Sequence, residues 1–177
     1  MILPLFRRAS RSGDTISALY GAIVAQARSP AFYRDYAVPD TLDGRFVLIL
    51  LHMALVLRRL GNEPELQPVG QEIFDLFCTD MDRNLREIGI SDLKVPKEMR
   101  RMGEAFYGRA QAYEAALASD DTGLLRTAIA RNVFGTDDAD HGGATRLAAY
   151  ILDASGRLAG QDVAAFNRGV VDFPEPA

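Results

Sequence analysis

The stretch FVLILLHMALVL, Phe46 to Leu57, decides the fold that this sequence predicts, and His52 is its one polar residue. At 1.5 Å per residue this run reaches about 18 Å, short of the roughly 30 Å hydrocarbon core of a bilayer. In the helix expected at 42–60, apolar residues lie nearly all the way round, so neighbours must cover it on several sides. We therefore predict a buried central helix rather than a membrane span.

Helical periodicity continues on both sides of this central helix. Asp14 or Thr15 is expected to cap the first helix and Asp40 or Thr41 the second, while Gly89 should end the third and Pro96 open the fourth. The chain shows no internal repeat and no long run of alternating apolar and polar residues. The predicted fold class is therefore all-α, a single compact bundle of about six to eight helices, at about 14–28, 42–60, 66–88, 96–117, 122–133, 143–155 and 161–170.

Composition places the chain among ordinary globular proteins. It has 177 residues, 48% of them hydrophobic and 25% charged, with a net charge of −4. This size suits one domain with a real core, and the acidic balance argues against DNA as a partner. The single cysteine, Cys78, excludes an internal disulfide and fits a reducing compartment.

The first thirteen residues are predicted to form a basic, flexible segment, followed by one all-helical domain over residues 14–177. In this segment the apolar residues precede Arg7, Arg8 and Arg11, the reverse of the order in a secretory signal. A short mitochondrial transit remnant stays open as an alternative. A weak contact of the N-terminus with RNA or with an anionic membrane surface also stays open. The contact with a membrane surface would make the chain a peripheral membrane protein.

Three features invite a catalytic or metal-binding interpretation. His52 has no acidic residue or cysteine within one helical turn, so we predict a core histidine bonded to a carbonyl or a partner side chain. Cys78 has no nearby histidine, so we predict a buried, inert thiol. The Asp137–His141 cluster could hold a metal ion, but it lacks EF-hand and zincin spacing, and capping a following helix is the simpler role. We predict no catalytic residue, no metal and no cofactor.

Asp80 and Asp82 resemble a pair of catalytic carboxylates until they are placed on a helix. Residues two positions apart point about 200° away from each other, so the two cannot serve one substrate. Asp82 instead faces Arg86, one turn further on, and a surface ion pair is expected between them.

The segment from Arg83 to Arg109 holds seven basic residues against four acidic ones. An ordinary solvated helix face would carry the same charges, and a docking surface for an acidic or phosphate-rich partner is the functional alternative. Met81, Met99 and Met102 could line an apolar groove there or belong to the core. The predicted partner-binding residues are Asp80, Asp82, Arg83, Arg86, Lys97, Arg100, Arg101, Tyr107 and Arg109.

Four segments, in this order, resemble the ubiquinol–cytochrome c chaperones over about residues 20–117. They are YGAIVAQARSPAFY (20–33), DGRFVLILLHMALVLRRL (43–60), QEIFDLFCTDMDRNLREIGI (71–90) and DLKVPKEMRRMGEAFYGRAQAY (92–113). The most specific matches are FYGR at 106–109 and the pattern D-x-D-x-x-x-R-x-x-G-I at 80–90. The resemblance gives no motif after Leu117.

This resemblance implies a non-enzymatic assembly chaperone. Its client would be unassembled cytochrome b or an early complex III intermediate, with a small assembly partner or the ribosome as further contacts. The absence of a long transit peptide favours a bacterial-type member in the cytoplasm or at the cytoplasmic face of the inner membrane; a eukaryotic one would act in the mitochondrial matrix or at the inner membrane. The alternatives are a metal-dependent helical enzyme using the Asp137–His141 cluster and a ribosome- or RNA-associated factor.

Overall fold

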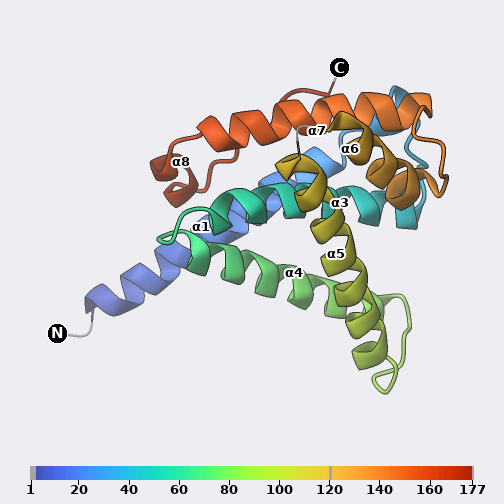
Figure 1. Cartoon of the computed structure of the whole chain (residues 1–177). Helices are drawn as coiled ribbons and strands as arrows, with labels where there is room; N and C mark the ends of the chain where they lie inside the picture. Colours follow the sequence, from blue (N-terminus) through green and yellow to red (C-terminus); the bar gives the residue numbers. More distant parts are fainter. Residues whose placement is uncertain (1–2, 120, 177) are drawn as a thin grey trace.

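The computed structural model describes residues 3–119 and 121–176, with side chains from residue 13 onward. All regular structure among these residues is helical, which confirms the predicted all-α fold. The helices pack closely around one core (Figure 1). In chain order they are α1 (Leu3–Ala27), α2 (Pro30–Arg34), α3 (Leu42–Gly61), α4 (Gln67–Glu87), α5 (Val95–Ala118), α6 (Thr122–Ile129), the π-helical turn η1 (Ala130–Phe134), α7 (Gly142–Gly160) and α8 (Val163–Asn167).

Helix α3 is the centre of the bundle, as its apolar sequence predicts. Every side chain from Val47 to Val56 is buried, and α1, α4, α5 and α7 all contact this helix. In Figure 1, α7 lies along one side of α3, and α4 lies on the opposite side. A helix that is apolar all round needs this arrangement, because any uncovered side would expose large aliphatic groups to water.

Local signals set several helix ends where the sequence predicts them. The Thr41 hydroxyl accepts a hydrogen bond from the Gly44 amide at 3.1 Å and caps α3. At the end of α4, the Gly89 amide bonds to the Arg86 carbonyl and the Ile90 amide to the Leu85 carbonyl. These two bonds form a Schellman motif, and Gly89 takes the left-handed conformation, φ 89°, that the motif requires.

Helix α1 begins at Leu3 rather than at Asp14 or Thr15. Pro4 lies in the first turn, where its missing amide hydrogen costs nothing, and no proline or glycine follows until Gly13. The helix therefore continues through the position that was expected to cap it. The flexibility expected of the N-terminal segment stays a prediction, because its side chains lie outside the described residues.

The core holds a chain of hydrogen bonds centred on His52. Its Nδ1 donates to the Leu48 carbonyl at 2.7 Å, and Tyr150 Oη donates to Nε2 at 2.9 Å. The Gln26 amide donates both to Tyr150 Oη and to the Pro174 carbonyl. The predicted core histidine is confirmed, and the network joins α1, α3, α7 and the C-terminal segment.

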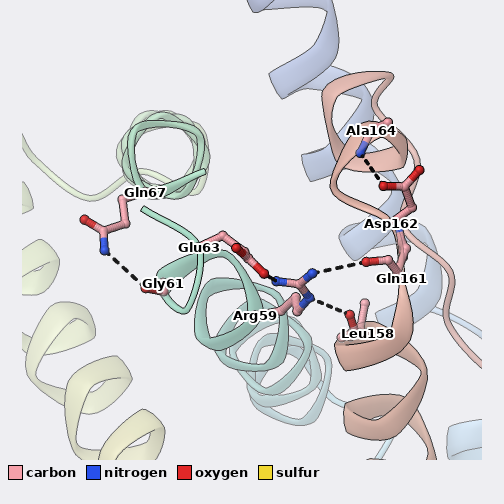
Figure 2. A network of polar contacts seen from close by, with 8 residues as sticks. All are labelled: Arg59, Gly61, Glu63, Gln67, Leu158, Gln161, Asp162 and Ala164. Carbon is pink, nitrogen blue, oxygen red and sulfur yellow. Dashed lines mark hydrogen bonds and ion pairs between the residues drawn. The ribbon is translucent and has the colours of Figure 1, made fainter. Parts of the chain in front are cut away.

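A second polar network fastens the end of α7 to α3 (Figure 2). Arg59 donates to the Leu158 carbonyl at 2.8 Å, to the Gln161 carbonyl at 3.1 Å and to Glu63 at 3.0 Å. Its guanidinium also lies over the Phe166 ring of α8. Arg59 thus supplies a donor to the Gln161 carbonyl and a second donor to the Leu158 carbonyl, which also accepts from the Gln161 amide.

Candidate functional site

Asp80 and Asp82 point to different partners, as their helical spacing predicts. Asp80 accepts hydrogen bonds from Tyr20 of α1 at 3.0 Å and from Arg83 at 2.5 Å. Asp82 pairs with Arg86 at 2.7 Å, which confirms the ion pair expected from the sequence. The hydrogen bond from Arg86 lowers the pKa of Asp82 below its ordinary value. The two carboxylates therefore do not share a site.

The bond between Tyr20 and Asp80 closes one side of a hollow between α1 and α4. Tyr20 is largely buried, and burial together with the bond to Asp80 raises the pKa of its hydroxyl. Val24 and Leu76 supply apolar wall, and Arg83 lies at the edge with most of its side chain exposed. An apolar hollow with a charged rim is suited to an apolar segment flanked by polar residues.

On α5 the predicted residues divide between two sides of the helix. Lys97, Arg100, Arg101 and Tyr107 are exposed, and Arg100 and Tyr107 share one face because they lie about two turns apart. Arg109 follows Arg100 by nine residues and therefore lies about 180° around the helix. Its side chain is half-buried, and its Nε is buried without a hydrogen-bond partner among the described residues.

Tyr107 stands on a cluster of aromatic rings. Its ring centroid lies 5.8 Å from that of Phe74 and 5.6 Å from that of Phe106, yet 63% of the residue is exposed. The same rings, with Gln71 and Leu57, line a second hollow between α3, α4 and α5. Tyr107 is therefore an aromatic side chain that packs on two other rings and still exposes most of its surface. Aromatic side chains of this kind often anchor protein interfaces.

The three methionines expected in a groove lie mostly in the core. Met81 is buried, with 7% of its surface exposed. Met99 and Met102 are partly buried and pack against the same core. The core interpretation therefore holds fully for Met81, whereas Met99 and Met102 also present some surface.

The Asp137–His141 cluster is not arranged as a metal site. Asp137 pairs with Arg131 at 2.6 Å and Asp140 with Arg126 at 3.2 Å, so each of these carboxylates has its own arginine partner. His141 Nδ1 accepts a hydrogen bond from the Ala144 amide and caps α7, a role that the sequence assigned to the acids. Among the described residues, no three His, Cys, Asp or Glu side chains come together as metal ligands.

Cys78 is half-buried against the core rather than fully buried. Burial raises the pKa of its thiol, so the reactive thiolate is disfavoured at neutral pH. The expectation of an inert thiol agrees with this direction, although part of the side chain reaches solvent.

Sequence reasoning missed Tyr20, Val24, Leu76 and Phe74, which form the walls of the two hollows. Tyr20 and Asp80 are 60 residues apart, and no local spacing connects them. Tyr107 was found because an aromatic residue among charges is conspicuous. The others resemble any core residue until α1, α4 and α5 are assembled.

Within the described residues, no helix is both long enough and apolar enough to cross a bilayer. A model of the ubiquinol–cytochrome c chaperone family matches residues 34–173. The chain belongs to this family. The matched range extends well past Leu117, where the sequence resemblance ended, and so includes α6, α7 and α8 of this ubiquinol–cytochrome c chaperone.

Named relatives of this family member come from animals and from a bacterium. Ubiquinol-cytochrome-c reductase complex assembly factor 1 of Xenopus laevis is 27% identical over 116 residues, 65% of this chain and 58% of that protein. The Homo sapiens protein of that name is 26% identical over 107 residues, 60% of this chain and 36% of that protein. The chain thus spans about a third to three-fifths of these relatives' lengths.

The crystal structure of the Cbp3 homolog from Brucella abortus matches nearly the whole chain. The identity is 39%, the TM-score is 0.86, and the match covers 99% of this chain and 97% of the other. A bacterial relative of this length fits the expectation of a bacterial-type member.

Proposed function

We propose that this chain is an assembly chaperone for respiratory complex III that binds unassembled cytochrome b or an early assembly intermediate. Family membership supports the assembly role. The observation that carries the binding role is the apolar hollow between α1 and α4, which has the Asp80–Arg83 ion pair at its rim. A client made of hydrophobic helices with polar ends presents the matching chemistry.

The charged face of α5, a helix that packs against α4, offers the client a second contact surface. Arg100 makes no ion pair among the described residues, and Arg101 only a loose one, 3.8 Å from Glu98. Both guanidinium groups are thus open to acidic groups on a client, while Tyr107 offers an aromatic contact nearby. The proposed location is the bacterial cytoplasm or the cytoplasmic face of the inner membrane, where such a client is made; a small assembly partner or the ribosome could bind beside it.

Charge reversal on α5 should separate client binding from folding. The variant R100E/R101E is expected to keep the wild-type thermal midpoint, because both side chains are exposed, and to lose at least about tenfold in captured cytochrome b. The measurement is affinity capture of the tagged chain from solubilised membranes, followed by quantitative mass spectrometry. R109E is a poor test, because Arg109 is half-buried and its reversal would disturb packing.

A second pair of variants tests the hollow itself. A25E places a charge in the hollow between α1 and α4, at an exposed alanine of its lining, and is expected to reduce capture as R100E/R101E does. A149E changes an exposed alanine of α7 in the same way and serves as the matched control. Normal cytochrome b capture by both R100E/R101E and A25E, with folding intact, would show that the client binds elsewhere. Steeply salt-dependent recovery of ribosomal RNA instead would favour the ribosome-associated alternative.

A further inference from the structure

The turn between α4 and α5 projects from the body of the molecule, at the lower right of Figure 1. We call residues 88–97 the α4–α5 tip. Its conformation is fixed at both ends: the Schellman motif at Gly89 closes α4, and Val95, with 1% of its surface exposed, anchors the start of α5. Lys94 and Val95 also bond through their amides to the Ser91 carbonyl. The backbone that carries the exposed side chains of this turn is therefore held in one conformation.

The tip presents two large aliphatic side chains to water. Leu93 is 95% exposed, the highest value for any large apolar residue among those described, and Ile88 is 69% exposed. A side chain that lines a hollow is partly covered by the other wall, and Leu93 is not. Exposed aliphatic side chains on one short projecting turn are suited to insertion into the apolar layer of a bilayer rather than to receiving a protruding side chain.

The charges around these two residues are distinctive. Lys94 and Lys97 are the only lysines among the 20 basic residues of the chain. Both are exposed, and neither makes an ion pair within the described residues. Among the nearby acids, Asp92 pairs closely with Arg86, whereas Glu98 and Glu87 lie 3.8 Å and 3.9 Å from Arg101 and Arg83 in loose ion pairs. The exposed aliphatic residues are thus accompanied by two ammonium groups that form no ion pair among the described residues.

We propose that the α4–α5 tip is a membrane-docking element for an anionic bilayer surface. Leu93 and Ile88 enter the interfacial layer, and Lys94 and Lys97 reach lipid phosphates while their aliphatic stems lie along the apolar boundary. A nucleic acid would use the lysines but leave Leu93 in water. An acidic protein segment is the remaining alternative, and the experiment distinguishes it.

Vesicle flotation of the full chain tests the proposal. Vesicles of phosphatidylcholine alone are compared with vesicles that contain phosphatidylglycerol as well. We expect binding to the anionic vesicles, and a loss of at least about tenfold in the partition coefficient for I88S/L93S and for K94Q/K97Q. Matched controls are L42S, which changes a leucine that is 83% exposed on α3, and R146Q/R168Q, which removes two exposed charges elsewhere. Both controls should bind as wild type.

Lysine acetylation gives an independent readout, because only two side chains can react. Anionic vesicles should protect Lys94 and Lys97 from an amine-acetylating reagent, and phosphatidylcholine vesicles should not.

Unchanged vesicle binding by both tip variants, or loss of binding only when residues 1–12 are removed, would overturn the proposal. So would loss of cytochrome b capture in detergent by I88S/L93S, since the tip would then bind protein; normal capture there supports a purely lipid contact.

Discussion

At the scale of single residues, the neutrality of His52 has the clearest consequence. The ring is fully buried, and burial lowers the pKa of His52 from 6.5 to about 4. Tyr150 donates to the Nε2 lone pair, a bond that only the neutral ring can accept. The folded state thus holds the deprotonated form, whereas the unfolded chain takes up a proton at a higher pH.

This difference predicts acid sensitivity. Because the unfolded state binds the extra proton, the free energy of unfolding should fall by about 3 kcal/mol as the pH drops from 6.5 to 4. Asp82 and Asp40, whose pKa values are lowered by arginine partners, lose their contributions only below their ordinary value of 3.8. Urea unfolding at a series of pH values measures the slope.

Variants at the two histidines control this measurement. H52Q should remove most of the pH dependence between 4 and 6.5, at some cost in stability because a core network is broken. H141Q changes the only other histidine and should leave that slope in place. An equal slope in wild type and H52Q would show that other groups control acid stability.

At the scale of elements, Arg59 determines how firmly α7 and α8 attach to α3. Only 10% of its side chain is exposed, and three of its nitrogens donate, two of them to backbone carbonyls at the end of α7. An ordinary surface ion pair contributes little to stability, but a buried guanidinium with several acceptors contributes more, because its loss removes the donor of the Gln161 carbonyl and one of the two donors of the Leu158 carbonyl.

Replacing Arg59 should therefore loosen this junction. R59A is expected to lose about 2–3 kcal/mol of unfolding free energy, and R59K somewhat less, because an ammonium cannot reach the same acceptors in a fork. R157A, which changes an exposed arginine of α7, should cost under about 0.5 kcal/mol. Hydrogen exchange should rise locally at residues 158–167 in R59A. Equal stability of R59A and R157A would contradict the assigned role.

At the scale of the whole molecule, the C-terminal segment completes the core rather than hanging free. Phe173 packs edge-on against the His52 ring at 5.3 Å, and Pro174 is buried and accepts a bond from Gln26. The segment thus shields the histidine network that joins α1, α3 and α7. The two proposed surfaces, the α1–α4 hollow and the α4–α5 tip, share α4 and would bring a client close to a bilayer.

A chain that ends at Val170 tests whether the C-terminal segment shields His52 and stabilises the core. It is expected to lose about 2–4 kcal/mol of unfolding free energy, from the aromatic contact and the lost carbonyl acceptor. Water would then reach His52 and bring its pKa back toward 6.5, so the acid-dependent slope should become shallower. A chain that ends at Glu175 keeps Phe173 and the Pro174 carbonyl and is the control. An unchanged slope in the shorter chain would mean that other residues shield His52.

Local signals allowed much of the fold to be predicted. Thr41, Gly89 and Pro96 placed helix ends because capping and backbone conformation depend on a few adjacent residues. The same kind of local signal gave a wrong helix start at Asp14. This good cap residue lies inside α1, because no residue upstream of it interrupts the helix. The ion pair of Asp82 with Arg86 was predictable for the same reason, since one helical turn fixes their separation.

The sequence by itself determined the all-α class, the central burial of α3 and the family, because these follow from apolar periodicity and from ordered motifs. Only the tertiary structure decided that Tyr20 bonds to Asp80. It also decided that Arg109 turns inward while Arg100 faces solvent, and that Leu93 is exposed on the same turn as the two lysines. These contacts depend on how α1, α4 and α5 cross, and packing of the assembled helices, not spacing along the chain, sets that geometry.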